Sequence, residues 1–373
     1  MGIASQDASE QLSALIDQLD AKLKHTFQNM HQGNPKHTLA RFLKAREWNA
    51  LKANKMLVDC LNWRMQNQID DILCKPITPA NLYRGIRDSQ LMGLSGYTKQ
   101  ARFRLVFSVP DCTWGVPVFA IGAGLTTFDK ASVNYYIQSH IQMNEYRDRV
   151  VLPAASRKHG RYIGTCFKVL DMTGLKFSSL SNLKVSICYY FSSYFLFVSP
   201  LLYLTVGIQL VSLMATIDDL NYPEKTETYY IVNAPYIFSA CWKVVKPLLQ
   251  ERTRRKVQVL DGCGKDELLK IMDYASLPHF CKRNGSRSSR YSSLDSDDCY
   301  SFDHPFHQEF YNYIVQQAKS KNNESLIKHG SLHVDVPEPD PEGIEIINTI
   351  ESELHKIGNQ NGVTRSLSGL KIV

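Results

Sequence analysis

The chain has 373 residues, of which 44% are hydrophobic and 21% charged, with 20 glycines and 15 prolines. These proportions exclude a collagen-like, coiled-coil or wholly disordered chain, and the length favours two packed domains with additional tails over one compact domain. The formal net charge of +7 favours anionic partners such as membrane surfaces or phosphate groups, and it gives no indication of nucleic-acid binding.

The cysteines are nine in number, widely spaced, and contain no C-x-x-C pair. They therefore predict neither a disulfide framework nor a zinc site, and we expect a reducing, cytoplasmic environment. The first residues, MGIASQDASE, lack a basic region followed by an apolar run, so no secretory signal is expected. His304 and His307 have no third ligand nearby in the sequence, so we predict no metal site.

The N-terminal part of the chain has the periodicity of amphipathic helices. Between residues 8 and 30 the apolar side chains recur at helical spacing, at Leu12, Leu15, Ile16, Leu19, Leu23 and Phe27. A second helix is expected after Pro35, with Thr38 as its N-cap, and a third from Asn49 to Gln68. We therefore predict a helical domain over residues 1–85.

From Gly115 onward, short β-rich runs alternate with longer helical stretches. The expected strands are PVFAIGAG, FKVLDM, TYYIVNA and KVQVLDG, and the expected helices include 130–148 and 238–249. This alternation predicts a parallel or mixed sheet covered by helices, and the strands are apolar on both faces, as buried parallel strands are. The fold class is therefore α/β, with this second domain over residues 86–281.

The composition changes after Cys281, where KRNGSRSSRYSSLDSDD is rich in Ser, Arg and Asp. Such a segment cannot bury enough apolar surface to order itself. We expect residues 282–373 to form a flexible tail with short helices, one of them over 306–319.

One long run has no charged residue, from Val185 to Ile217. Its length satisfies the criterion of ~20 residues for a transmembrane helix, and membrane helices tolerate its central Pro200. However, the run lies between two expected strands of one sheet, where a spanning helix would have to leave and re-enter a packed core. A buried helix or an inserted segment is the alternative.

Two charged residues precede neighbouring strands. Glu224 follows Pro223 before one strand, and Lys256 stands at the start of the next. A carboxylate and an ammonium at adjacent strand ends can form a structural ion pair, and they can also bind a phosphodiester headgroup through charge-assisted hydrogen bonds. The motifs of P-loops, serine hydrolases and zinc proteases are not found in the sequence, so no catalytic site and no cofactor are predicted.

Four segments together resemble the CRAL-TRIO lipid-binding family, and within it the plant Sec-fourteen-like phosphatidylinositol transfer proteins. They are TLARFLKAREWNALKANKMLVDCLNWR, GVPVFAIGAGLTTFDKASVNYYIQSHIQMNEYRDRVVLP, KVLDMTGLKFSSL and NYPEKTETYYIVNAPYIFSACWKVVKPLL. The resemblance implies a helical N-terminal domain beside a CRAL-TRIO α/β domain, whose mixed, mainly parallel sheet floors a pocket for one phospholipid. A movable gate helix closes the pocket.

The resemblance also implies the roles of particular residues. The phosphatidylinositol headgroup site corresponds to Arg46, Glu224 and Lys256. The gate helix corresponds to Phe238–Leu249, with its side chains Phe238, Trp242, Val245 and Leu248. The positions that bind phosphatidylcholine in the founding type correspond to Cys166, Lys168 and Phe119, so phosphatidylinositol is the expected ligand and the choline lipid is not implied.

Two segments are insertions relative to the family pattern. Joining Lys184 to Leu210 restores the pattern, and the extra piece, 185–209, begins and ends with codons that fit intron boundaries. We interpret it as a translated retained intron; the alternative is a membrane-spanning or membrane-dipping segment. A second candidate insertion is 101–114.

The expected function is phosphatidylinositol binding, exchange between membranes and presentation to lipid kinases, without catalysis. The expected location is the cytoplasm, with peripheral association at the Golgi or plasma membrane. The alternative is a membrane-anchored adaptor that uses 185–217 as its anchor.

Overall fold

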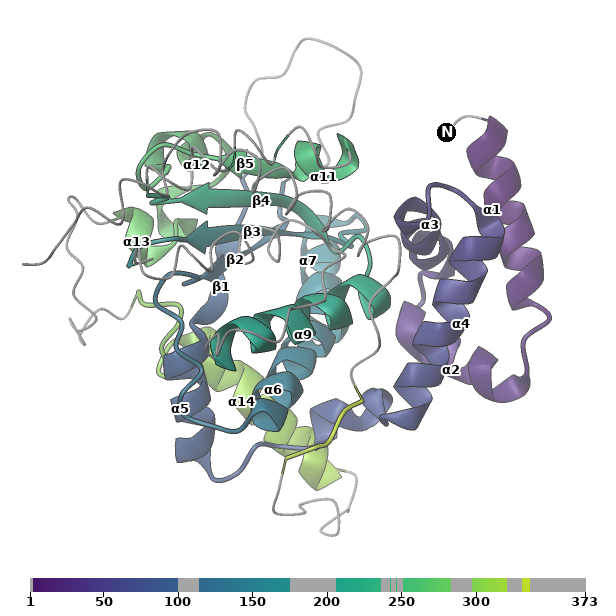
Figure 1. The fold of residues 1–373 in the computed structure, drawn as a ribbon, viewed down its shortest axis with the longest axis horizontal. Helices are drawn as coiled ribbons and strands as arrows, with labels where there is room; N and C mark the ends of the chain where they lie inside the picture. The colour runs from purple at the N-terminus through teal and green to yellow at the C-terminus, as the bar shows by residue number, and fades with distance from the viewer. Residues whose placement is uncertain are drawn as a thin grey trace, which may run out of the picture.

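The structure is a computed structural model that describes residues 3–99, 114–174, 206–235, 242, 246, 251–282, 297–320 and 331–335 (Figure 1). Four helices form an N-terminal unit that lies beside the remainder of the chain (Figure 1). They are α1 (Ile3–Ile16), α2 (Ala21–His31), α3 (Pro35–Ala45) and α4 (Ala50–Gln66). The unit has its own apolar core, whose least exposed members are Leu12, Phe42, Leu43, Leu57 and Leu61.

The expectation of a single helix over 8–30 is wrong, because the helix ends at Ile16 and a new one begins at Ala21. Asp20 is the N-cap of α2, and its Oδ1 accepts hydrogen bonds from the backbone N–H groups of Lys22 at 2.8 Å and Leu23 at 2.9 Å. A capping Asp starts a new helix because it satisfies N–H groups that have no helical partner. The apolar spacing continued across this break and concealed it.

The start of α3 also differs from the expectation. The helix begins at Pro35 after Asn34, and the predicted cap Thr38 is a buried residue within it. Proline is favoured in the first turn of a helix because its missing N–H has no partner there. The Thr38 hydroxyl accepts a hydrogen bond from Arg41 Nη2 at 3.1 Å.

The remaining chain forms an α/β domain around a five-stranded sheet of order β1-β2-β3-β4-β5. Strands β2, β3, β4 and β5 are parallel to one another, and the edge strand β1 pairs with β2 in the antiparallel direction. The strands are β1 (Met92–Tyr97), β2 (Pro117–Ile121), β3 (Cys166–Asp171), β4 (Thr226–Val232) and β5 (Val257–Val259). The four expected strands and the mixed, mainly parallel sheet are confirmed.

The sequence did not predict β1, whose MGLSGY segment has little apolar character. Its glycines explain the composition, because another part of the chain lies against them. A Cβ on Gly93 would lie 1.7 Å from the carbonyl oxygen of Cys299, and one on Gly96 would lie 2.5 Å from the Ser276 side chain. Glycine is therefore required at the two positions where β1 packs closely against Cys299 and Ser276.

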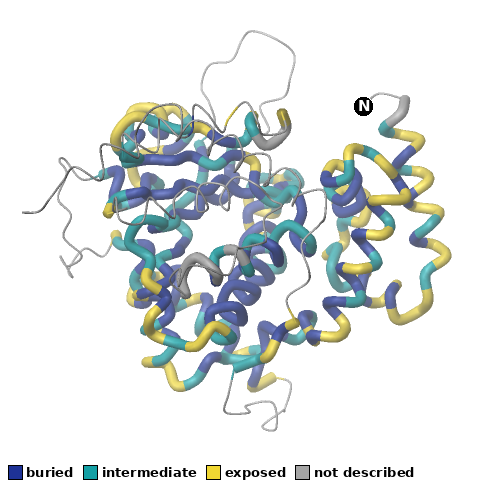
Figure 2. Tube along the Cα trace, in the orientation of Figure 1, coloured by how far each residue is buried: buried dark blue, intermediate teal, exposed yellow. Residues whose placement is uncertain are grey.

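Helices cover both faces of the sheet (Figure 1). One face packs against α6 (Val133–Tyr146), α9 (Val206–Asn221), α5 (Ala80–Gln90) and α14 (Pro305–Ser320). The other face packs against α7 (Leu152–His159), α12 (Lys265–Ile271) and α13 (His279–Lys282). The smaller elements are η1 (Ile69–Cys74), η2 (Arg147–Val151), η5 (Tyr274–Ser276) and α11 (Glu251–Lys256). Figure 2 shows that the strands and the helices packed on them contain most of the buried residues.

The helix that we expected in a flexible tail, α14, belongs to the core of the α/β domain. Its residues Phe306, Phe310 and Ile314 are at most 6% exposed, and the Phe310 ring lies 4.5 Å from that of Tyr146. Residues 331–335 also contact the core, since Trp63 Nε1 donates a hydrogen bond to the Asp335 carbonyl at 2.8 Å. The helix itself was predicted over 306–319, but the polar composition of the preceding segment concealed its place in the core, where it stabilises the domain by burying apolar surface.

Several expectations fall outside the described residues. They concern most of the candidate insertion 101–114, the segment 185–205 and most of 238–249. Residues 206–209, the end of the interpreted intron, form the first turn of α9. Among the helices that the structure describes, none combines the length and the apolar character needed to cross a membrane.

Candidate functional site

Glu224 and Lys256 meet at one edge of the sheet. Strands β4 and β5 are parallel neighbours, so the residues that precede them lie at the same edge. Glu224 comes two residues before β4, and Lys256 directly precedes β5. Lys256 Nζ lies 2.7 Å from Glu224 Oε2, and the two side chains are 24% and 15% exposed. The expected acid and base therefore form an ion pair that is partly accessible to a ligand.

The backbone at Glu224 is in the left-handed region, with φ = 58°. For a residue with a Cβ this conformation costs about 1–2 kcal/mol. The tight turn between α9 and β4 imposes it, and the turn directs Glu224 toward Lys256 while the next residue, Lys225, pairs with Asp148. Adjacent residues of one turn thus serve two different charged clusters.

Arg46 directly follows α3 and is half-buried. Its Nη1 donates a hydrogen bond to the carbonyl of Ala45 at 3.2 Å. The interactions described for Glu224 and Lys256 join these two residues to each other, and the membership of Arg46 in a headgroup site stays a prediction. Of the predicted gate side chains, only Trp242 is described, and it is 6% exposed; Phe238, Val245 and Leu248 lie outside the described residues.

The sheet face toward α6 and α9 contains a buried charged cluster that the sequence did not predict. Lys168 of β3 is 8% exposed, and its Nζ lies 3.6 Å from Asp218 Oδ2 on α9. His140 Nε2 lies 2.7 Å from Asp218 Oδ1, and Asn144 Nδ2 donates to the same oxygen at 2.6 Å. We name Lys168, Asp218, His140 and Asn144 the sheet-face cluster.

The charges of the sheet-face cluster stabilise one another. Burial alone would favour the neutral form of Asp218, but His140, Lys168 and Arg147 outweigh it and hold the pKa of this carboxyl well below its usual range. Burial likewise disfavours charged Lys168, while Tyr229 and Asp218 raise its pKa. Lys168 therefore remains an ammonium, whose contacts with Asp218 and the Tyr229 ring fix its position on the sheet.

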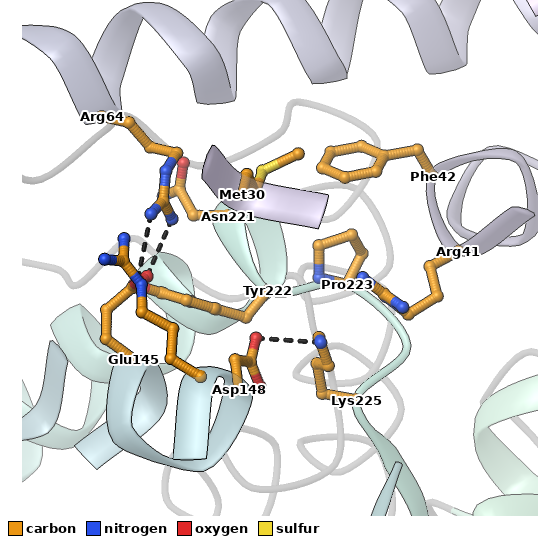
Figure 3. A pocket seen from close by; sticks show the side chains of 11 residues that line it. Met30, Arg41, Phe42, Arg64, Glu145, Asp148, Asn221, Tyr222, Pro223 and Lys225 are labelled. Atoms are coloured by element: carbon orange, nitrogen blue, oxygen red, sulfur yellow. Dashed lines mark hydrogen bonds and ion pairs between the residues drawn. The ribbon is translucent and has the colours of Figure 1, made fainter. Parts of the chain in front are cut away.

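A second charged cluster joins the N-terminal helices to the α/β domain (Figure 3). Arg64 of α4 forms a two-pronged contact with Glu145 of α6, at 2.8 and 3.0 Å. Arg149 Nε lies 2.8 Å from Glu145, and the Tyr222 hydroxyl donates to Glu145 at 2.7 Å. Burial opposes the charge on Glu145, but Arg64 and Arg149 lower its pKa to about 2. This junction holds the two parts of the chain together.

Glu145, the carboxylate at the centre of this junction, lies on a helix that is buried on nearly every side. In α6, all residues from Tyr136 to Tyr146 are buried. A helix that is buried all round must satisfy its polar side chains internally. The polar residues within an otherwise apolar stretch, above all Glu145, could have indicated a buried partner in the sequence.

Comparison with known families now identifies the architecture. The family described as "CRAL/TRIO domain" matches residues 198–282, and the one described as "CRAL/TRIO, N-terminal domain" matches residues 8–59. Two separate segments of the chain therefore match the two domains of the CRAL/TRIO family. The N-terminal match falls on the helical unit, and the CRAL/TRIO match includes Glu224 and Lys256.

Proteins similar to this chain include the phosphatidylinositol/phosphatidylcholine transfer proteins SFH9 and SFH11 of Arabidopsis thaliana. SFH9 is 26% identical over 66% of this chain, and SFH11 is 27% identical over 70%. The matched regions span 37% of SFH9 and 60% of SFH11. The Sec14 cytosolic factor of Schizosaccharomyces pombe is 24% identical over 65% of this chain and 72% of its own length.

Among solved structures, the crystal structure of Sfh5 is similar to this chain. It has a TM-score of 0.46 and 16% sequence identity, and the alignment covers 84% of this chain and 98% of that chain.

Proposed function

We propose that the protein binds phosphatidylinositol and exchanges it between membranes. The observation on which this rests is the ion pair of Glu224 and Lys256, which lie 2.7 Å apart at one edge of the sheet. These are two of the three residues that the family resemblance assigns to the inositol headgroup, the third being Arg46. The names of the relatives SFH9 and SFH11, which describe phosphatidylinositol/phosphatidylcholine transfer, support the same ligand class.

The two charges of the pair suit the two polar parts of the headgroup. A carboxylate accepts hydrogen bonds from inositol hydroxyls, and an ammonium pairs with the phosphodiester. Glu224 and Lys256 neutralise each other's charge in the ion pair. An entering headgroup would replace their mutual contact with contacts of each side chain to the inositol phosphate. Both side chains are partly exposed, so this exchange does not require a deeply buried ion pair to open.

The physics of lipid transfer requires a carrier with a protected cavity. Moving two acyl chains of about 16 carbons into water costs on the order of 25 kcal/mol, at ~0.8 kcal/mol per CH₂. The protein must therefore load its lipid while it is docked on a bilayer. Peripheral binding to cytosolic membrane faces, including the Golgi or the plasma membrane, and presentation of the lipid to lipid kinases belong to this proposal, which includes no catalytic step.

The test is transfer of labelled phosphatidylinositol between vesicles by Glu224→Ala and Lys256→Ala variants. We expect each substitution to abolish transfer, because it leaves the other charge without its partner and removes a headgroup contact. Loss of this partly exposed pair should lower the free energy of unfolding by about 1 kcal/mol or less. The control is Lys270→Ala, which breaks the exposed pair between Lys270 and Glu267 on α12, and it should transfer lipid normally.

Two outcomes contradict the proposal. If both site variants transfer phosphatidylinositol at the rate of the unmodified protein, the pair is structural. If the unmodified protein moves no phosphatidylinositol between vesicles although its circular dichroism and thermal unfolding show a folded chain, the exchange function is wrong.

A further inference from the structure

A small cleft opens at the junction of the N-terminal helices and the α/β domain (Figure 3). Its walls come from α2, α3, α4, α6, η2 and the turn between α9 and β4. The open space within it is about 20 Å³, which admits a group the size of one or two water molecules. The cleft therefore suits the oxygen atoms of a small ligand better than a bulky apolar group.

The charged residues around the cleft are linked by ion pairs, with an excess of cations. Among the described residues, the contacts join Arg64 and Arg149 to Glu145 and Asp70, and Arg147 and Lys225 to Asp148. These links leave four cations for three carboxylates. Extending the set to the sheet-face cluster adds Lys168 and Asp218, one charge of each sign.

Arg41 is a further cation in the wall of the cleft. Its guanidinium donates to two neutral hydroxyls, those of Tyr162 at 2.9 Å and Thr38 at 3.1 Å. The described contacts thus assign it no carboxylate, and with Lys225 protonated the cluster carries an excess of two positive charges. Buried charges without counter-charges are costly, so an anionic group in the cleft would lower the free energy of this arrangement.

Two hydrogen-bond donors in the wall have no partner among the described residues. Asn221 is 4% exposed, and its Nδ2 is buried without an acceptor. Arg41 Nε is likewise buried without an acceptor. Both residues line the cleft. A buried donor without an acceptor destabilises the folded state, and an acceptor placed in the cleft would remove this penalty.

Lys225 adds a third group that would gain from an anion. Its side chain is 11% exposed, and its Nζ lies 2.9 Å from Asp148. Burial and the neighbouring charge of Arg41 lower the pKa of Lys225 to about 7, against the opposing effect of Asp148. An anion between Arg41 and Lys225 would screen their mutual repulsion.

We propose that a phosphate group binds at the mouth of this cleft, with oxygens that enter the cleft, accept hydrogen bonds from Arg41 and Asn221 and pair with the ammonium of Lys225. A phosphomonoester has a charge of about −1.5 to −2 at neutral pH, which matches the excess charge of the cluster. A neutral ligand such as water would satisfy the donors but leave the excess charge uncompensated.

The phosphate can belong to a soluble anion or to a phosphorylated inositol lipid. Lys225 follows Glu224 in the chain and Pro223 lines the cleft, so the cleft lies beside the pair of Glu224 and Lys256. A phosphomonoester on an inositol ring held by that pair would lie near the cleft. This assignment to a lipid rests on the proposed function, whereas binding of phosphate itself does not.

The first experiment is calorimetric titration of the full chain with inorganic phosphate at pH 7. We expect saturable binding that Arg41→Gln and Lys225→Met each weaken at least tenfold. The control is Lys36→Gln, which removes an exposed charge from the first turn of the same helix, α3, and should leave phosphate affinity unchanged. Thermal unfolding of each variant verifies that it is folded.

The second experiment separates the two sources of phosphate. Phosphatidylcholine vesicles containing either phosphatidylinositol or phosphatidylinositol phosphate are sedimented with the protein. A preference for the phosphorylated lipid that Arg41→Gln removes and Lys36→Gln retains supports a lipid headgroup. Phosphate binding without such a preference supports a soluble anion.

Failure of the phosphate site is distinguishable from failure of the proposed function. Glu224→Ala should abolish phosphatidylinositol transfer and still bind inorganic phosphate. The inference is overturned if the unmodified chain binds no phosphate, or if folded Arg41→Gln and Lys225→Met variants bind it as tightly as Lys36→Gln does.

Discussion

Strand β3 has two faces that bury very different side chains. Phe167 and Val169 point into the apolar cluster formed with α7, α12 and α13. Between them, Lys168 lies on the opposite face and pairs with Asp218 of α9. All residues of the strand are buried, so one backbone segment contributes to both an apolar core and the sheet-face cluster.

The difference shows that the two faces are stabilised in different ways: the Phe167 face by apolar packing, and the Lys168 face by charge pairing beside an apolar cluster. Burial of apolar surface stabilises the fold directly, whereas a buried ion pair often contributes little compared with well-packed apolar residues. The sheet-face cluster is therefore poorly explained by stability alone. Its Asp218 lies on α9, the helix that leads into the turn of Glu224 and Lys225, and the contacts of Asp218 with β3 and α6 fix the position of that helix on the sheet.

The largest effect should follow truncation on the apolar face. Phe167→Ala removes a ring that is 4% exposed and packs 5.9 Å from the Tyr230 ring. We expect the free energy of unfolding, measured by urea denaturation, to fall by about 3–5 kcal/mol, because the change leaves a cavity. Leu51→Ala is the control, since Leu51 is 73% exposed and should change the value by less than about 0.5 kcal/mol. A loss of less than about 1 kcal/mol for Phe167→Ala would contradict the claim that apolar packing on this face stabilises the fold.

Elements that show a local apolar pattern could be predicted from the sequence, whereas those that depend on contacts between distant residues could not. Strands such as β2 were predictable because a short, continuous apolar run bounded by turns is typical of a buried parallel strand. Helix α14 was assigned to a tail because its surroundings are polar, although Phe306 and Phe310 pack in the core. Strand β1 was missed because Gly93 and Gly96 are required by close contacts with Cys299 and Ser276, which are distant in sequence and which no local pattern reveals.

The site was predictable only in part, because strand pairing could be inferred from the sequence and the packing of the helices could not. Glu224 and Lys256 each precede a strand, so parallel pairing brings them to one edge, and the family resemblance gave them a role. The partners of Lys168 and Glu145 could not be predicted. Asp218 and Arg64 come from helices distant in sequence, and only the packing of those helices on the sheet and on each other brings the charges together.

An intermediate effect should follow disruption of the sheet-face cluster. Asp218→Asn leaves the buried ammonium of Lys168 and the imidazole of His140 without their carboxylate. We expect the free energy of unfolding to fall by about 3 kcal/mol. In the double variant with Lys168→Met, the unpaired charge is removed, and at least half of that loss should be recovered. If the two changes are instead additive in a double-mutant cycle, Lys168 and Asp218 do not stabilise each other.

The smallest effect concerns pH and the junction cleft. Lys225 faces Arg41 of α3 and Arg147 and Asp148 of η2; burial and the Arg41 charge lower its pKa from 10.5 to about 7 in the folded chain. Between these values the unfolded chain binds more protons than the folded chain, so this lysine makes stability rise with pH. From pH 7 to pH 8 we expect the free energy of unfolding, measured in urea without phosphate, to rise by about 1 kcal/mol more in the unmodified protein than in Lys225→Met. Equal changes in the two proteins would mean that Lys225 keeps an ordinary pKa. Added phosphate should reduce the difference, because an anion beside the ammonium favours its charged form and brings its pKa back toward that of the unfolded chain.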